Sequence, residues 1–222
     1  DTVLIEGVSL IGYPVSLFRT PPPHTLGTDV SITAPLFVGG TQSGIFTNTN
    51  TRAKGGNITL QTRSLTVREG AEINAITTNS IDALGNGQGG IIRIATEQLN
   101  LLNGGKLSVS TASRGAAGTI QISADQLQIA GDDPFYLPRL EEFIPSEIDF
   151  YGKSRRGSHS TSGIFASTVP ESSGAGGTIA IDTGDLSILD NARVSVDSQG
   201  TGDGGTIRIG AGDILLDRGN IV

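Results

Sequence analysis

The sequence predicts an all-β fold: a right-handed, single-stranded parallel β-helix, a solenoid with three strands per coil and about six coils. The first observation is a recurring glycine doublet whose second members are Gly56, Gly90, Gly118, Gly177 and Gly205. The second is a fixed pattern of aliphatic residues that follows each doublet in the sequence. The third is the spacing of 28 residues from Gly90 to Gly118 and from Gly177 to Gly205, which is too short for a helical crossover and suits one circuit of a triangular coil.

Two short strands are expected after each doublet. The residues two, four, nine and eleven places after the second glycine are aliphatic in all five repeats. A spacing of two marks one face of a strand, and the gap of five between the two pairs marks a bend. The expected inward positions are Ile58, Leu60, Leu65, Val67, Ile92, Ile94, Leu99, Leu101, Ile120, Ile122, Leu127, Ile129, Ile179, Ile181, Leu186, Ile188, Ile207, Ile209, Ile214 and Leu216.

A third strand is expected fifteen to nineteen places after the glycine, again with alternate residues facing inward. Glu72 and Lys106 then share one outward position of two neighbouring coils, where opposite charges help by a few tenths of a kcal/mol, and Arg193 holds the same position two coils further on. The inward residues of this strand are Ala71, Ile73, Ala75, Gly105, Leu107, Val109, Ala192, Val194 and Val196.

Two stretches of the chain are longer than one coil requires. The sequence predicts a long inserted loop in each of them, at about residues 8–42 and at 132–161. Val3 and Ile5 match Leu127 and Ile129, and the sequence Ser-Gly-Ile-Phe at 43–46 is repeated at 162–165. We expect residues 1–222 to form one β-helix fragment of a longer protein, since the chain has no initiator Met, no signal peptide and no capped ends. The expected coils A to F start at residues 1, 56, 90, 118, 177 and 205, and coils A and D carry the loops.

The composition excludes several classes of function. A net charge of -7 and a pI near 4.7 argue against nucleic-acid binding, which needs a basic surface. No apolar stretch is long enough to span a membrane. The absence of cysteine excludes disulfides and thiolate metal sites, and it is compatible with export of an unfolded chain. We expect no cofactor.

No catalytic or metal site is expected from the coil pattern. Polysaccharide-cleaving β-helices need two or three carboxylates on one outward face. Asp182 is the only carboxylate in the outward columns of the first strand. Asp185 follows a bend, where an aspartate commonly makes an Asx-turn. His24 and His159 fall in different insertions, so a shared metal ion is not expected.

The insertions are the expected recognition segments, because loops on a rigid scaffold commonly hold binding residues. Most of the aromatic residues lie in them. One interpretation is that these aromatics form a small core that pins each loop over Phe46 and Phe165. The other is ligand contact, with a glycan stacked on a tyrosine or an acidic partner held by arginine. The candidate contact residues are Tyr136, Tyr151, Arg155 and Arg156.

Three segments carry a resemblance to a known family. Gly-Gly-Asn-Ile-Thr-Leu at 55–60, Gly-Gly-Thr-Ile-Ala-Ile at 176–181 and Ser-Gly-Ile-Phe-Ala-Ser-Thr at 162–168 resemble the repeat region of filamentous haemagglutinin-like large exoproteins of the cyanobacterial type. The resemblance implies a β-helix, two-partner secretion through an outer-membrane transporter, and an extracellular location. The family's amino-terminal secretion domain is not evident in this chain, and its haem-utilisation label finds no support in the residues.

The expected function is therefore that of a secreted or cell-surface β-helical segment with a structural or adhesive role. Its expected partners are surface glycans or other cells, together with a secretion partner for the full-length protein. The alternative is a glycan-binding or polysaccharide-cleaving β-helix. An outward carboxylate cluster in a groove is the feature that distinguishes the enzyme from the adhesin.

Overall fold

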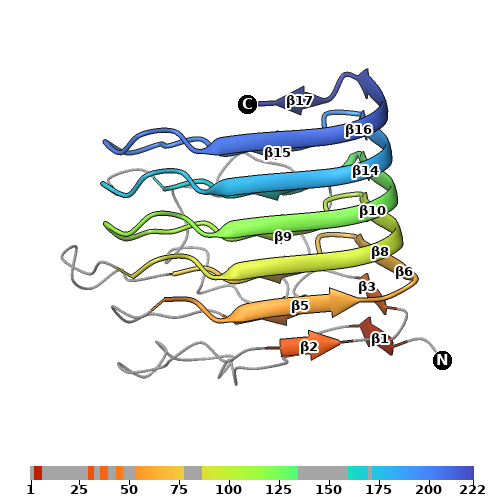
Figure 1. The fold of residues 1–222 in the computed structure, drawn as a ribbon, viewed down its shortest axis with the longest axis horizontal. Helices are drawn as coiled ribbons and strands as arrows, with labels where there is room; N and C mark the ends of the chain where they lie inside the picture. The colour runs from red at the N-terminus through yellow and green to blue at the C-terminus, as the bar shows by residue number, and fades with distance from the viewer. Residues whose placement is uncertain are drawn as a thin grey trace.

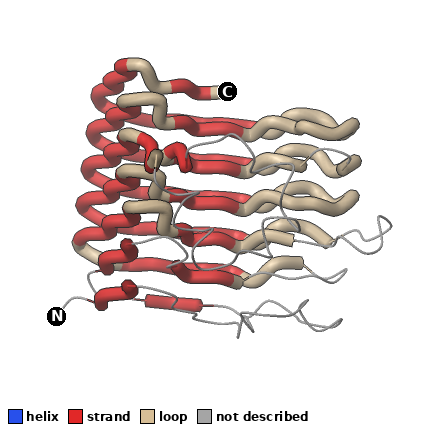
Figure 2. Tube along the Cα trace, turned by 180° about the vertical axis from the view of Figure 1, so that it is seen from behind, coloured by secondary structure: helices blue, strands red, loops and turns tan. Residues whose placement is uncertain are grey.

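The computed structural model is a parallel β-solenoid, which confirms the predicted fold class (Figure 1). All regular secondary structure in the described part of the chain is β-strand. Seen from behind, the strands form a continuous stack with the loops gathered at the corners (Figure 2). The structure describes residues 3–6, 30–32, 36–39, 44–47, 54–77, 87–134, 160–169 and 172–222.

The larger sheet holds the first and second strands of each coil. In the coil of residues 57–68 these are separate strands, and in the next four levels they join into a single strand of 12 residues that bends in the middle. Neighbouring levels pair in parallel with matching registers, such as Ile120 with Ile92 and Ile179. The strands are β5 (Asn57–Gln61), β6 (Ser64–Arg68), β8 (Ile91–Leu102), β10 (Thr119–Ala130), β14 (Thr178–Leu189) and β16 (Thr206–Asp217).

The smaller sheet holds the short third strands, stacked in parallel in the order β17-β15-β13-β9-β7-β4. These strands are β4 (Gly44–Phe46), β7 (Glu72–Asn74), β9 (Lys106–Ser108), β13 (Gly163–Phe165), β15 (Arg193–Ser195) and β17 (Asn220–Ile221). Four turns, from β5 to β15, have a neighbouring level on both sides. The expected number of about six coils is reached only when the level below β5 and the level formed by β16 and β17 are included.

The aliphatic residues of the repeated pattern form the core of the solenoid. From Ile58 to Ile188, every expected inward residue of the first and second strands is at most 3% exposed. The third-strand residues, such as Ile73 and Leu107, are buried as well. Ile214 and Leu216 are about half exposed, at 53% and 49%, because β16 pairs on one side only, with β14.

The glycine doublets close each coil against the coil before it. The Gly118 amide donates a hydrogen bond to the Val109 carbonyl at 2.7 Å, and the Gly90 amide donates to the Ala75 carbonyl at 2.8 Å. A Cβ atom on Gly118 would overlap the carbonyl oxygen of Gly90 and lie 2.8 Å from the Val109 Cβ. The doublet therefore permits a backbone approach that no larger residue allows.

A column of hydroxyl residues lies at the same corner, twenty-one places after the glycine in three coils and beyond the second insertion in the coil of Gly118. Thr77, Thr111, Thr168 and Ser198 are joined by successive parallel bridges. The Thr77 hydroxyl donates to the Gln88 carbonyl at 2.7 Å, and the hydroxyls of Thr168 and Ser198 lie 3.2 Å apart. These polar side chains supply hydrogen bonds to the irregular backbone of the corner.

A tight turn links the second and third strands. Its residues have positive φ in pairs, for example 47° at Asn103 followed by 88° at Gly104, and 51° at Asp190 followed by 67° at Asn191. Glycine, asparagine and aspartate tolerate this backbone best. In coil D the second insertion takes the place of this turn, after Gly131.

The predicted boundaries of the first insertion, residues 8–42, are wrong at their C-terminal side. β2 (Val30–Ile32) pairs with β5 and β3 (Leu36–Gly39) pairs with β6, so both belong to the coil that ends in β4. β1 (Val3–Glu6) pairs with β3 and therefore lies one level further down, not in the coil of β4. Residues 8–29 and 40–43 lie outside the described residues.

The physical reason is a shorter bend. Ile32 and Leu36 are four residues apart, whereas their register partners Leu60 and Leu65 are five apart. A fixed spacing of five therefore does not detect the second strand of this coil.

The second predicted insertion, residues 132–161, begins and ends in a small antiparallel ladder. β11 (Asp132–Asp133) pairs with β12 (Ser160–Thr161), with Asp133 opposite Ser160. The adjacent Ser162 hydroxyl donates to the Ala130 carbonyl at 2.7 Å and accepts from the Gly104 amide at 2.9 Å. The two ends of the insertion are thus fixed to each other and to the coil below.

The inward and outward assignment predicts opposite effects for two nearby substitutions. Ile122→Asp places a charge among stacked aliphatic side chains and should lower the free energy of unfolding by about 3–5 kcal/mol or prevent folding. Thr119→Asp, on the outward side of the same strand, should change it by less than about 1 kcal/mol. Urea denaturation of the two variants measures this, and equal midpoints would contradict the assignment.

The close backbone approach at the doublets predicts that one added methyl group lowers the stability of the protein strongly. Gly118→Ala should destabilise the protein by at least about 1–3 kcal/mol, because the new Cβ overlaps the Gly90 carbonyl. Gly204→Ala is the control: it also lies in a doublet, but its Cβ would meet no atom within 4 Å. Thermal unfolding followed by circular dichroism compares them. A Gly118→Ala melting temperature equal to that of Gly204→Ala would refute the role assigned to the doublet.

Candidate functional site: a groove on the third-strand face

The candidate contact residues from the insertion, Tyr136, Tyr151, Arg155 and Arg156, lie outside the described residues, as do His24 and His159. Their roles remain predictions. The predicted outward columns, in contrast, can be followed along the whole stack. Each of the three strand faces carries a groove.

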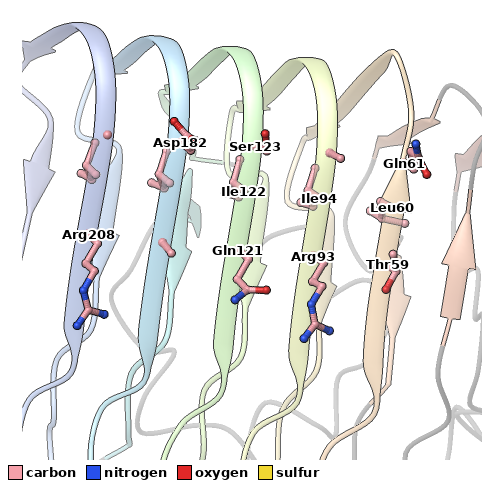
Figure 3. A pocket seen from close by; sticks show the side chains of 15 residues that line it. Thr59, Leu60, Gln61, Arg93, Ile94, Gln121, Ile122, Ser123, Asp182 and Arg208 are labelled. Atoms are coloured by element: carbon pink, nitrogen blue, oxygen red, sulfur yellow. The ribbon is translucent and has the colours of Figure 1, made fainter.

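The first-strand face carries a groove of about 580 Å³ (Figure 3). Arg93 and Arg208 extend in the same direction from one outward column, with Gln121 and Ala180 between them. They are three rungs apart, or about 14 Å at the usual strand spacing. Asp182 is the only acidic residue that lines this groove, as the sequence predicted. The arrangement offers exposed cations on an open face.

The second-strand face carries a groove of about 460 Å³ with a row of amide and carboxylate side chains. Gln98, Gln126, Asp185 and Asp213 are successive register partners. Asp185 therefore has an acidic neighbour one rung away, which was not expected from the first-strand columns. The signal was present in the sequence, because both aspartates lie eight places after the second glycine of their doublets.

The third-strand face carries a smaller groove of about 280 Å³ that combines an aromatic ring with many polar groups. It spans the sheet from β7 to β15. The lining residues are Glu72, Lys106, Ser108, Ser110, Phe165, Ser167, Thr168, Val169, Arg193, Ser195, Asp197 and Gln199.

Phe165 is the aromatic residue that lines this groove, and it lies on the sheet surface. A Cβ atom on Gly163 would be 2.6 Å from the Phe165 Cζ and 2.7 Å from its Cε2, so the ring covers Gly163. The register partners of Gly163 are Lys106 on one side and Arg193 on the other. The half-buried ring thus lies between two outward cationic positions. Phe165 therefore points outward, which is the direction required if loop aromatics are to pack over it.

Serine hydroxyls line the same groove; Ser110 and Ser167 are half-buried, and Ser108 and Ser195 are buried. The Ser108 and Ser110 hydroxyls are 3.1 Å apart, and the Ser167 hydroxyl lies 3.4 Å from both the hydroxyl and the carbonyl oxygen of Ser195. A serine hydroxyl can both donate and accept a hydrogen bond. This part of the groove therefore suits a ligand that also has groups of both kinds.

The charges of the groove are balanced. Arg193 donates to the Asp197 carboxylate at 2.6 Å, and Glu72 is the register partner of Lys106. Two cations and two carboxylates line the groove. Its net charge does not favour an ionic ligand of either sign.

Two separate contacts require a glycine at position 163, under the Phe165 ring. Its Cβ would overlap the Arg193 carbonyl as well as the ring. Gly44 and Phe46 repeat this arrangement in β4, with the Phe46 Cζ 2.6 Å from a Cβ on Gly44. The repeated sequence Ser-Gly-Ile-Phe was thus a signal for a ring that covers a glycine, although its chemistry could not be read from sequence alone.

Other kinds of site were sought in the described residues. No three His, Cys, Asp or Glu side chains among them come together in a way that could hold a metal ion. The part of the chain that the structure describes contains no helix that is long and apolar enough to cross a membrane.

The chain was also compared with known proteins. No family model, no curated protein and no solved structure matches it.

Proposed function

We propose that the chain is a secreted or cell-surface β-helical segment with a structural or adhesive role, part of a haemagglutinin-like exoprotein. The observation that supports this proposal most directly is the unbroken ladder between levels. β10 pairs with β8 below and β14 above along nearly its whole length. Such a stack resists bending and shear, because every level is held by its neighbours.

An adhesive role needs a recognition element on this scaffold, and the second insertion has the right position for it. The ladder of Asp132–Asp133 with Ser160–Thr161 fixes both ends of the insertion at the corner of coil D. Loops with fixed ends on a rigid scaffold can display binding residues without disturbing the core. We assign ligand contact to Tyr136, Tyr151, Arg155 and Arg156 of this insertion.

The proposed secretion rests on the resemblance of the repeat sequences and is compatible with the absence of cysteine. An antibody raised against this segment should label intact cells of the source organism. Labelling that requires permeabilised cells would exclude the surface location.

A loop replacement tests the adhesive role. Residues 134–159 are replaced by Asn-Gly, which forms a two-residue hairpin turn between the paired residues Asp133 and Ser160. The solenoid should remain folded, because shortening a loop costs little closure entropy and the strands on both sides are kept. Adhesion of protein-coated beads to cells or glycan surfaces should fall to background.

The control is the parent chain, with circular dichroism and melting temperature recorded for both proteins. If the aromatic residues of the insertion act as a clamp over Phe165, the replacement lowers the melting temperature and the parent shows no specific binding. If the replaced protein folds and adheres as well as the parent, the insertion has neither role.

A polysaccharide-cleaving role is the alternative, and the neighbouring Asp185 and Asp213 are the observation that favours it. Adjacent rungs of a parallel sheet are about 4.8 Å apart, close to the carboxylate separation of about 5–5.5 Å in retaining glycosidases. If the pair is catalytic, Asp185→Asn and Asp213→Asn should each reduce polysaccharide cleavage by at least about 100-fold. Reducing-end release from a polysaccharide panel measures it, with Asp182→Asn as the control, and the absence of cleavage by the parent would exclude this alternative.

A further inference from the structure

We infer that the groove around Phe165 is a binding site for a neutral, pyranose-containing glycan. This inference rests on the proposed adhesive role and names a ligand class and a second contact surface for it, outside the insertion. Three observations point to this ligand: the orientation of the ring, the composition of the polar groups and the size of the groove.

The ring provides a flat apolar surface. Because the Phe165 ring covers Gly163, its Cζ and Cε2 end lies against the backbone of β13. The ring is half-buried, so part of it remains accessible. A pyranose presents a flat face of C–H groups, which can stack on such a ring and remove apolar area from water.

The polar groups match the hydroxyls of a sugar. A sugar hydroxyl donates one hydrogen bond and accepts others, so it needs both kinds of partner. The groove supplies the half-buried hydroxyls of Ser110 and Ser167, the Asp197 carboxylate as acceptor, the Arg193 guanidinium as donor and the exposed Gln199 amide, which offers both. A purely anionic or cationic ligand would face one repelling group for each attracting group, since the four charges balance.

The size limits the ligand to a short part of a chain. A volume of about 280 Å³ is at the lower end of small-molecule pockets, which start near 300 Å³. The groove therefore suits one or two sugar units of a longer glycan. The open face lets the rest of the glycan extend beyond it.

Phe165→Ala is the main test, and Phe46→Ala is its matched control. Both rings cover a glycine of the same sheet, so both variants lose a similar packing contact. Only Phe165 lines the groove. Gln199→Ala is a second test variant, because this exposed side chain lies in the groove and outside the core.

The probes are hexasaccharides of β-1,4-linked glucose, mannose and galactose, with the galacturonic acid hexamer as the charged comparison. Binding to the full 222-residue chain is measured by titration calorimetry. At least one neutral probe should bind, Phe165→Ala should weaken it about tenfold, and Gln199→Ala should weaken it by a few-fold. Phe46→Ala should bind as the parent does, with a melting temperature close to that of Phe165→Ala.

Three outcomes would overturn the inference: no binding of any neutral probe, tighter binding of the galacturonic acid hexamer, or equal loss in Phe165→Ala and Phe46→Ala. Should Phe165→Ala fail to fold, unchanged binding by Gln199→Ala would overturn it as well. The bead-adhesion assay separates this result from the proposed function. Adhesion that persists in Phe165→Ala and is lost on replacement of residues 134–159 would leave the adhesive role intact and remove only this site.

Discussion

The close backbone contact at the glycine doublets is the constraint on which the rest of the structure depends. At Gly118 the chain passes so near the carbonyl of Gly90 that a Cβ atom has no room, and the same contact recurs at Gly177 against Gly118. This approach sets the position at which each coil with a glycine doublet starts. The following strand then falls in register with the strand below, and its aliphatic side chains stack on their equivalents. The core is thus aligned by its corners as much as by its own packing.

The interior of the fold was predictable because it repeats. A strand face with a period of two, a fixed bend and a fixed glycine determine which residues point inward, and Ile122 and Leu127 are buried as this pattern requires. The outward neighbours follow from the same register, which is why Glu72 and Lys106 could be paired in advance. The spacing of twenty-one after the glycine was a usable signal for Thr77, Thr111 and Ser198 of the hydroxyl column, whereas the second insertion displaces Thr168 from it.

Departures from the repeat could not be predicted with a fixed spacing. The coil that contains Val30–Ile32 has Gly27 followed by Thr28 where the others have two glycines, and its bend is one residue shorter. A search that requires both features assigns the segment to a loop. The groove at Phe165 was missed for another reason. Its residues come from several coils, and the position of the ring depends on a contact with Gly163 that no periodicity encodes.

Inward and outward positions also differ in what they serve, because inward residues stabilise the fold and outward residues are available for function. Inward positions must satisfy a neighbour above and a neighbour below, so a change at one level strains three. Outward positions meet only solvent and the adjacent rungs, and each face has accordingly taken a different character: arginines near Gln121, amides and aspartates near Gln126, and an aromatic ring among serines near Ser108. The ring at Phe165 is the case in which both demands meet. The missing side chain of Gly163 permits the tight approach to the Arg193 carbonyl and also leaves the space that the end of the Phe165 ring occupies. A constraint of the scaffold thus creates the surface to which we assign ligand binding.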